Sequence, residues 1–465
     1  MGSADSRLVV VSNRVAVPRT GRPPSGGLAL AVNHALAERG GLWFGWNGRI
    51  VSEPPERPSH RQRGKVEYFT TALSTTEHAD YYQGFANRVL WPLMHGRLAM
   101  LTYRRRYEEA YRSTNARFAD HLMKLVKPDD VVWVHDYHLV PLASELRMRG
   151  FNGLIGFFLH TPFPPFDILR CLPIYRTMLE WLCAYDLVGF QTDIDRHAFL
   201  DAAAYELHAR RSRGGGIRFN GRETATGVFP VGVEVNQIVD QARRGRSSRQ
   251  VRTLKSSLGG RRLIIGADRL DYSKGLVERL CAYEHLLDTY PELHGEIVYL
   301  QVAEPSRSEV PEYQEIRHQL DQMAGEIIGS HARFDWVPIR YMSQRMPRSR
   351  LLAFFSAARV GLVTPLRDGM NLVAKEYVAA QDPYDPGVLV LSELAGAARE
   401  LDAALLVNPY DVDTTGDAIA RALNMPLEER KERWKHLISI VRKNDILAWG
   451  ERFLGRLEAT RHRPE

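Results

Sequence analysis

Two cationic side chains follow a predicted strand in the segment ADRLDYSKGL (267–276). Arg269 comes directly after the apolar run, Lys274 follows a short turn, and Gly275 precedes a helical pattern. Cations beside a helix start can hold a diphosphate as it leaves a sugar, because its negative charge grows as the bond breaks. The same residues could be surface charges on an ordinary loop, and the P-loop pattern GxxxxGK[ST] is absent from the segment.

The segment PLRDGMNLVAKEYV (365–378) carries carboxylates on both sides of a predicted helix start. If Asn371 begins the helix, the backbone N–H groups after it can hold a phosphate. Asp368 can then accept hydrogen bonds from sugar hydroxyls, and Glu376 can bind a ribose diol. The alternative is a helix capped by Asp368 or Asn371 with a solvated Glu376. Nothing places the two acids on opposite sides of one bond, as a hydrolase requires.

Arg14 ends the first apolar run, and the pair Gly26-Gly27 opens the next helical pattern. Two adjacent glycines let backbone N–H groups approach a ligand closely, and a helix start favours anions. A glycine pair is also ordinary turn chemistry, so this segment alone is weak evidence for a site.

Further polar residues end other predicted strands. HDYHL (135–139) places Asp136 between two histidines, and His160 and Arg307 follow later strands. The group in HDYHL could join a metal site, but such a site needs at least three convergent ligands. Asp136 can equally accept hydrogen bonds from a polyol without any ion, and His160 can be a structural histidine at the end of a buried strand.

The elements that position these residues follow an alternating pattern. Short apolar runs rich in β-branched residues alternate with helical stretches such as 193–211, 276–290 and 311–329. Continuous apolar strands between helices predict parallel sheets covered on both faces, where ligands bind at the carboxyl ends of the strands. The stretch 238–261 is rich in Arg, Ser and Gly, so we expect a linker there.

The predicted fold class is therefore α/β, with two Rossmann-like doubly wound domains and a cleft between them. We expect the first domain to cover 1–237 and the second domain to cover 238–445. We also expect the final helix, 446–465, to pack back on the first domain.

Composition limits the class of protein. The 465 residues are 44% hydrophobic and 25% charged, without an apolar run long enough to span a bilayer. Three scattered cysteines suit a reduced compartment, so we expect a cytoplasmic protein. We also expect that the protein binds neither membrane nor nucleic acid. The net charge of +7 includes basic clusters at 209–222 and 242–252 that match no recognisable nucleic-acid-binding module. We interpret these clusters as solvated loops.

Taken together, the motifs resemble the trehalose-6-phosphate synthases, retaining glycosyltransferases of the two-Rossmann-domain (GT-B) type in family 20. The resemblance covers about residues 7 to 455. It is carried by VVSNR, SGGL, GLWFGWNG, YYQGFANRVLWPLMH, WVHDYHL, GFFLHTPFP, DRLDYSKGL, TPLRDGMNLVAKEYVAAQ and GVLVLSELAGAA.

The resemblance implies transfer of glucose, with retention, from a nucleotide-glucose to glucose-6-phosphate, giving α,α-trehalose 6-phosphate. It implies that the acceptor phosphate is clamped by the residues matching Arg14, Tyr82, Trp91 and Arg307, and that Asp136 binds the acceptor sugar. Trp46 matches a tryptophan of the loop that closes the site, although Trp43 is near enough to leave that choice open.

For the donor, the resemblance implies that Arg269 and Lys274 hold the diphosphate, Asp368 the glucose hydroxyls and Glu376 the ribose. Further donor contacts match Gly27, His160, Gly369 and the backbone that follows it, at Met370, Asn371, Leu372 and Val373. The residues implied in catalysis are Arg269, Lys274, Asp136 and His160.

The implied mechanism is a front-face displacement in which the leaving phosphate takes the acceptor proton, so no side-chain nucleophile, metal or cofactor is expected. UDP-glucose is the expected donor, with GDP- and ADP-glucose left open. The resemblance also implies a homo-oligomer, a tetramer or a dimer. Two alternatives remain: a relative that uses glycerol 3-phosphate or a pseudo-sugar phosphate as acceptor, and a non-catalytic sugar-phosphate sensor.

Overall fold

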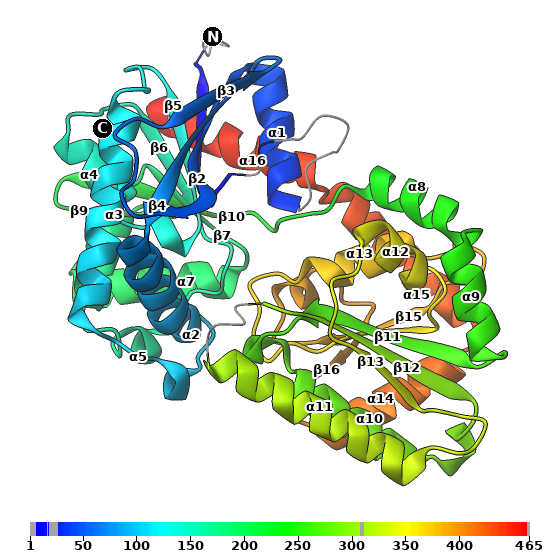
Figure 1. The fold of residues 1–465 in the computed structure, drawn as a ribbon. Coiled ribbons are helices and arrows are strands. Elements are labelled where there is room, and N and C mark those ends of the chain that lie inside the picture. The colour runs from blue at the N-terminus through cyan, green and yellow to red at the C-terminus, as the bar shows by residue number, and fades with distance from the viewer. Residues whose placement is uncertain (1–5, 16, 18–26, 307–310, 463–465) are drawn as a thin grey trace. The chain divides into compact units, whose positions relative to one another are not determined.

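The computed structural model describes residues 6–15, 17, 27–306 and 311–462 (Figure 1). The chain forms two compact units. Unit 1 comprises Met1–Val231 and Ile446–Glu465, and unit 2 comprises Gly232–Asp445. The helix α16 (Ile446–Glu458) therefore belongs to unit 1, although the whole of unit 2 precedes it in the sequence.

Unit 1 contains a ten-stranded sheet whose strand order is β3-β4-β2-β1-β5-β6-β7-β10-β9-β8. The strands from β4 to β10 in this order are parallel, and β3, β9 and β8 extend the two edges in antiparallel pairings. The bounds are β1 (Leu8–Arg14), β2 (Gly41–Val51), β3 (Ser59–Arg63), β4 (Val66–Ser74), β5 (Val131–His135), β6 (Leu154–Phe158), β7 (Leu187–Phe190), β8 (Arg210–Arg211), β9 (Ile217–Phe219) and β10 (Arg222–Val228).

Helices cover the middle of this sheet, where β5, β6 and β7 are apolar along almost their whole length. Every residue of β5 and β7 is buried. The remaining helices of unit 1 are α1 (Gly27–Arg39), the π-helix η1 (Glu77–Leu90), α2 (Trp91–Met94), η2 (Leu98–Met100), α3 (Arg105–Met123), η3 (Tyr137–Leu139), α4 (Leu142–Met148), α5 (Phe166–Leu169), α6 (Tyr175–Leu182), α7 (Asp193–Glu206) and η7 (Ala459–His462).

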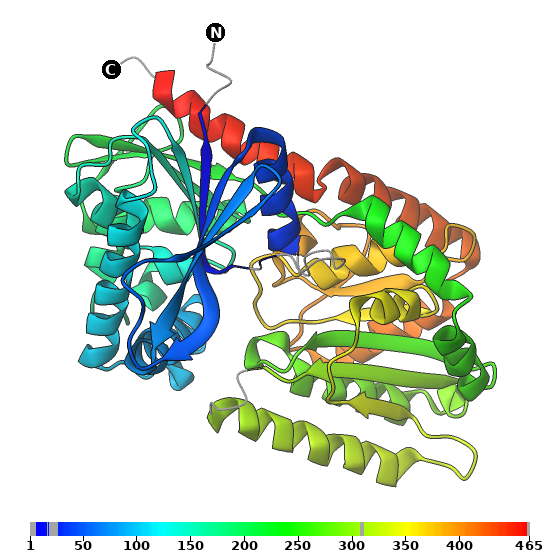
Figure 2. The same cartoon turned by 45° about the horizontal axis from the view of Figure 1, so that its top comes forward.

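The helix α16 lies against β6 and β7 and beside α1 (Figure 2). The ring of Phe453 seats over two glycines of these strands, since a Cβ on Gly156 or Gly189 would come within 2.9 Å of it. Trp449 packs on Trp133 of β5 with ring centroids 5.0 Å apart. Small residues on the strands therefore make room for large aromatic residues on α16.

Unit 2 contains a six-stranded, fully parallel sheet with the order β13-β12-β11-β14-β15-β16. Apart from β13, which contains Arg340 and is half-exposed, these strands are the continuous apolar runs of the second half of the chain. Their bounds are β11 (Arg262–Arg269), β12 (Ile297–Glu304), β13 (Ile339–Met342), β14 (Val360–Val363), β15 (Val388–Ser392) and β16 (Leu405–Val407). The predicted α/β class with two doubly wound sheets is confirmed.

Helices lie on both faces of the unit 2 sheet, with α10, α11 and α14 on one face and α8, α12, α13 and α15 on the other (Figure 1). The bounds are α8 (Val235–Arg246), α9 (Arg249–Leu258), η4 (Tyr272–Lys274), α10 (Leu276–Thr289), η5 (Pro291–Leu293), α11 (Pro311–His331), α12 (Arg348–Phe355), α13 (Leu372–Ala380), η6 (Gly396–Arg399), α14 (Val412–Asn424) and α15 (Leu427–Lys443).

The expectation of a linker over 238–261 is wrong. This stretch forms most of α8 and all of α9, and Ser248 caps α9 by accepting a hydrogen bond from the Val251 backbone. Val251, Leu254 and Leu258 form a narrow buried stripe at helical spacing, which the surrounding arginines and serines obscure in the sequence.

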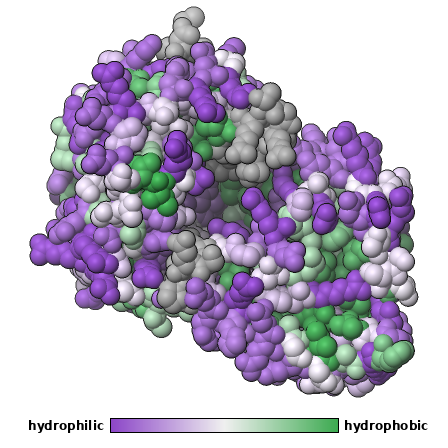
Figure 3. Space-filling model, in the orientation of Figure 1, coloured by the Kyte–Doolittle hydropathy of each residue, from purple (hydrophilic) through white to green (hydrophobic). Residues whose placement is uncertain are grey.

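No helix among the described residues is long and apolar enough to cross a membrane. On the face drawn in Figure 3, hydrophilic residues cover most of the surface and hydrophobic residues form scattered patches.

Candidate active site

The parallel strands of each sheet have one point where their order reverses, and predicted site residues gather at these points. In unit 1 the reversal lies between β1 and β5, and in unit 2 between β11 and β14. Ligands of doubly wound sheets bind at the carboxyl ends of the strands that flank such a point. Arg14, Asp136, Arg269 and Asp368 all lie at or just beyond these four strand ends.

At the end of β1, the guanidinium of Arg14 lies over the ring of Trp46, 4.9 Å from its centroid. Gly48 makes this position possible, because a Cβ there would come within 2.0 Å of the guanidinium. The indole of Trp46 donates a hydrogen bond to the Arg49 carbonyl. The stack orients an exposed cation and leaves its charge available to an anionic ligand.

The alternative tryptophan lies elsewhere. Trp43 is buried in the core and its indole donates to Ser12 at 2.8 Å. The structure therefore brings Trp46, and not Trp43, to Arg14. Trp46 belongs to β2 itself, whereas the sequence suggested a loop.

Rings from η1, η3 and α2 continue from Trp46 along this end of the sheet. Tyr82 lies 5.3 Å from Trp46 and 6.0 Å from His138, measured between ring centroids. His138 stacks on Tyr137 at 4.1 Å, and Tyr137 lies 5.9 Å from Trp91. Three of the predicted acceptor residues thus belong to one aromatic group, although they come from different segments of the chain.

Asp136, just after β5, has an unusual backbone. Its φ is +74°, which makes it one of four non-glycine residues with positive φ in the described part of the chain. Its carboxylate accepts a hydrogen bond from the backbone N–H of His160 at 3.3 Å. Residues held in this conformation cluster at binding sites, because surrounding contacts must offset the strain.

His160 forms a pair with His135, whose ring is fully buried. The His135 Nδ1 atom lies 3.3 Å from the His160 Nε2 atom. Burial lowers the pKa of His160 to about 3 and also lowers the pKa of His135 well below its usual value, with a smaller contribution from His160. Both rings are therefore neutral near pH 7, and one donates its single N–H to the other.

In unit 2, Lys274 and Asp368 form an ion pair between the turn after β11 and the loop after β14. The same carboxylate oxygen of Asp368 accepts a hydrogen bond from the Asn371 side chain at 3.1 Å. Asn371 in turn caps α13 by accepting from the Ala374 backbone. The sequence suggested either a capped helix or a binding loop, and the observed geometry combines a cap by Asn371 with an Asp368 held by two donors.

Close backbone packing fixes the loop that carries Asp368. Gly369 faces Gly396, where a Cβ would meet the Gly369 carbonyl oxygen at 1.9 Å. The backbone of Gly396 donates to the Asp368 carbonyl at 3.0 Å, and the backbone of Ala397 donates to the Met370 carbonyl at 2.8 Å. The stretch GMNLV (369–373) therefore enters α13 along a backbone path that its neighbours determine.

Arg279 of α10 is a residue that the sequence reading missed. Its side chain is fully buried, pairs with Asp268 at 2.9 Å and donates to Thr364 at 3.0 Å. It also donates to the backbone carbonyl of Lys274 at 3.2 Å. Arg279 thus links the ends of β11 and β14 to the turn that presents Lys274. The only sequence signal was an arginine five residues after Lys274, which is indistinguishable from a surface charge on a helix.

Glu376, on α13, is not a solvated charge. Its carboxylate accepts from Arg348 of α12, with distances of 3.0 Å to Nε and 2.7 Å to Nη2. Arg348 also donates to Gln237 of α8 at 3.2 Å. One Glu376 oxygen is held by this arginine, so the carboxylate has a fixed orientation.

The remaining predicted residues are placed as follows. Arg269 is exposed at the end of β11, and Gly27 is the first residue of α1. Arg307 lies outside the described residues. Among the residues that the structure describes, no three or more His, Cys, Asp or Glu side chains are grouped to hold a metal ion.

Comparison with known proteins agrees with these features. A model of glycosyltransferase family 20 matches residues 6–459. Trehalose-6-phosphate synthase from Enterobacter sp. strain 638 is 49% identical over 455 residues, covering 98% of this chain and 95% of the relative.

Two solved structures have the same fold. An α,α-trehalose-phosphate synthase (UDP-forming) from Burkholderia xenovorans, in complex with glucose-6-phosphate, is 47% identical with a TM-score of 0.93, covering 97% of this chain and 100% of that one. The E. coli protein bound with UDP-2-fluoro glucose is also 47% identical with a TM-score of 0.93, covering 97% and 99% of the two chains.

Proposed function

This chain belongs to glycosyltransferase family 20, and we propose on that basis that it transfers glucose, with retention, from UDP-glucose to glucose-6-phosphate. The products are α,α-trehalose 6-phosphate and UDP. The observation that carries the donor half of the proposal is the group of Lys274, Asp368 and the start of α13 at the strand reversal of unit 2. It combines a cation for phosphate, an acceptor for sugar hydroxyls and a helix start in one loop system.

Unit 1 binds the acceptor in this proposal. Arg14 supplies positive charge for the phosphate, and Trp46, Tyr82 and Trp91 define the space around it. We include Arg307 as a second phosphate ligand on the basis of the family resemblance alone. Asp136 accepts hydrogen bonds from the acceptor sugar. Because the Asp136 carboxylate is held by a backbone N–H of His160, its oxygens keep a fixed direction.

Unit 2 binds the donor. Arg269 and Lys274 hold the diphosphate, and Lys274 has three N–H donors, so it can keep Asp368 while donating to a phosphate oxygen. Asp368 holds glucose hydroxyls, the backbone from Gly369 to Val373 contacts the phosphate and sugar, and Glu376 binds the ribose. His160, neutral near pH 7, and Gly27 add contacts to the donor.

The reaction needs no side-chain nucleophile. As the bond from the anomeric carbon to the diphosphate breaks, negative charge grows on the leaving oxygen, and the fixed cations stabilise it. That phosphate oxygen accepts the proton of the acceptor hydroxyl as the new bond forms on the same face of the sugar. Catalysis consists of orientation and charge stabilisation, which rigid side chains supply without reorganising.

The direct test is release of UDP from UDP-glucose that depends on glucose-6-phosphate. A donor panel of UDP-, GDP- and ADP-glucose measures the preference for the base. A second panel replaces the acceptor by glycerol 3-phosphate, the main alternative acceptor. No release with glucose-6-phosphate would contradict the proposal, and undiminished activity with glycerol 3-phosphate would favour the alternative. We expect activity to survive a chelator, because the cations that meet the diphosphate are side chains.

We further propose that the enzyme is a cytoplasmic homo-oligomer, a tetramer or a dimer. The support is the content of three cysteines for the compartment and family membership for the assembly. Light scattering of the purified chain distinguishes the oligomers from a monomer.

A further inference from the structure

Unit 2 contains a basic recess apart from the candidate active site. It encloses about 810 Å³, counting the space open to solvent. We call it the basic recess and define it by its five cationic lining residues, Arg246, Lys255, Arg261, Arg262 and Arg359. Among the described residues, two carboxylates, Asp382 and Asp385, line it as well, so its walls carry an excess of positive charge.

The basic recess lies at the amino ends of the strands of unit 2, whereas the donor residues lie at their carboxyl ends. Arg262 begins β11 and Arg269 ends it. A strand rises about 3.3 Å per residue, so roughly 23 Å separates the two ends. Arg359 directly precedes β14, which pairs with β11, so it lies beside the start of β11. A ligand in the recess would therefore not reach the donor residues.

Some of the lining cations already have structural partners. Arg261 donates to the carbonyls of Leu258 and Gly295, and Arg246 donates to the Gln381 carbonyl and pairs with Asp382 at 2.8 Å. The carboxyl ends of α9 and α13 point to the amino ends of these strands. A helix carries partial negative charge at its carboxyl end, so cations are expected here. These two arginines are therefore accounted for without a ligand.

The other three cations exceed what the carboxylates can neutralise, although Arg262 also donates to the Leu423 carbonyl and to the Asn424 side chain, both at 3.3 Å. Asp385 is shared, since it pairs with Arg430 at 2.6 Å and with Arg359 at 3.4 Å. Lys255 and Arg262 have no carboxylate within 4.0 Å among the described residues. Burial, followed by repulsion from Arg430 and Arg262, lowers the pKa of Arg359. An anion in the recess would relieve this repulsion.

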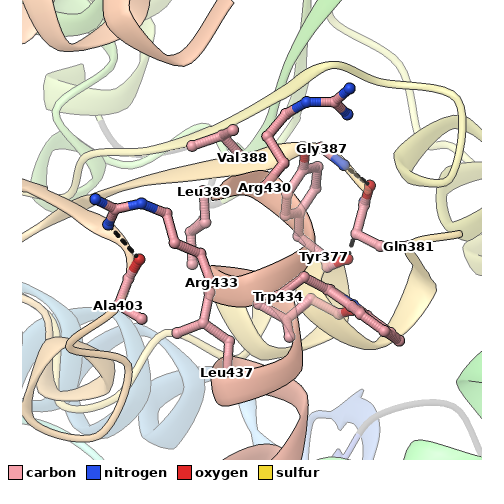
Figure 4. A pocket seen from close by; sticks show the side chains of 11 residues that line it. Tyr377, Gln381, Gly387, Val388, Leu389, Ala403, Arg430, Arg433, Trp434 and Leu437 are labelled. Atoms are coloured by element: carbon pink, nitrogen blue, oxygen red, sulfur yellow. Dashed lines mark hydrogen bonds between the residues drawn. The ribbon is translucent and has the colours of Figure 1, made fainter. Parts of the chain in front are cut away.

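The side chain of Gln381 holds the turn that carries Asp382 and Asp385 in place. Gln381 donates to the Tyr377 carbonyl and accepts from the backbone of Gly387 at 2.9 Å, as Figure 4 shows. Its side chain also donates to the Phe355 carbonyl. A rigid turn keeps Asp382 and Asp385 against their arginines, so they do not move to neutralise the other cations.

We propose that the basic recess binds a compact anion with two or more phosphate groups, such as inorganic pyrophosphate. Arg359, Lys255 and Arg262 supply the charge-assisted hydrogen bonds that phosphate oxygens accept. No aromatic side chain lines the recess in the described part of the chain, so a nucleotide base would have nothing to stack on. The proposal therefore specifies phosphate recognition without base recognition.

Calorimetric titration of the full chain with pyrophosphate tests this proposal, in an Arg269→Ala background that weakens the donor site. We expect one pyrophosphate per chain. Lys255→Glu should weaken its binding by about 10–100-fold, as expected for loss of a charge-assisted hydrogen bond. The matched control is Arg252→Glu, which makes the same charge change on the same helix. Arg252 is exposed and does not line the recess, so this control should change the affinity by less than about threefold.

Absence of pyrophosphate binding would overturn the proposal. An equal loss of affinity in Lys255→Glu and Arg252→Glu would also overturn it, because it would indicate attraction to the overall positive charge and not to a specific site. ADP should bind within about threefold of pyrophosphate, since no base contact is expected. Much tighter binding of ADP would overturn the assignment to a compact anion. Lys255 is exposed, so its substitution does not threaten folding, and a thermal melt of each variant checks this.

Discussion

Lys274 and Asp368 pair with each other across 94 residues of sequence, with side chains only 10% and 14% exposed. Both residues of this partly buried pair are proposed donor ligands. Its Coulomb attraction acts in a medium less polar than water, so each charge holds the other in place. The cation is thereby kept where the departing diphosphate develops its charge.

Lys274→Ala should lower kcat by about 10²–10³-fold, the usual effect of removing one fixed donor from a developing charge. The donor KM should change much less, because the lost interaction is strongest in the transition state. UDP release under saturating acceptor measures both constants. Lys435→Ala, which removes an exposed lysine of unit 2, is the control. A raised donor KM with unchanged kcat would assign Lys274 to ground-state binding alone.

Arg279→Gln should lower the free energy of unfolding by about 3–5 kcal/mol, because it leaves the buried Asp268 without its charge partner. It should also lower kcat by about 10-fold in the fraction that remains folded, since the Lys274 carbonyl loses a donor. Urea denaturation and kcat separate the two effects. Adding Asp268→Asn should recover stability but not kcat. Recovery of both would reduce Arg279 to a purely structural residue.

Acid should destabilise unit 1 through its histidine pair. The unfolded histidines titrate near pH 6.5, whereas burial lowers the folded pKa of His160 to about 3. The contribution is complete above about pH 6.5 and is lost as the pH falls toward 3, by up to about 1.4 kcal/mol per pH unit for each histidine. Urea denaturation between pH 7 and 5 should show a shallower pH dependence in His160→Gln. His197→Gln, at an exposed position of unit 1, should leave it unchanged, and equal slopes in all three proteins would contradict the prediction.

Glu376→Ala should raise the donor KM by about 10–100-fold and leave the acceptor KM unchanged, because a carboxylate that binds a diol makes two charge-assisted hydrogen bonds. Wild-type enzyme should discriminate against a donor with a 2′,3′-dideoxyribose, and the variant should not. Arg348→Ala is the companion variant, because it leaves Glu376 in place but removes the arginine that orients its carboxylate. If Glu376→Ala still preferred the natural ribose, another residue would bind the diol.

The sequence predicted the regular elements well where the apolar pattern was long. The run 262–269 and the helical stretch 276–290 match β11 and α10 to within one residue. The failure at 238–261 has a physical cause. Helix α8 buries only Val235, Ile238 and Ala242, so its stripe is narrow and many arginines surround it.

The site was predictable where residues end strands, because the parallel topology brings strand ends together. Arg14, Asp136, Arg269 and Asp368 belong to this group. Arg279 and the partner of Glu376, Arg348, were not predictable, since each acts through a contact distant in sequence and has no motif of its own. The strain at Asp136 was also invisible, because an aspartate in a strand-end loop does not signal a positive φ.

The helix α16 completes unit 1 only after unit 2 has been made. Phe453 covers Gly156 and Gly189, and Trp449 covers Trp133. During synthesis, the covered residues leave the ribosome about 300 residues before the two aromatic residues of α16. At about 5–20 residues per second, this apolar surface waits for tens of seconds. The nascent chain should therefore need a chaperone or a temporary cover for unit 1, while unit 2, which is continuous in sequence, can fold as soon as it emerges.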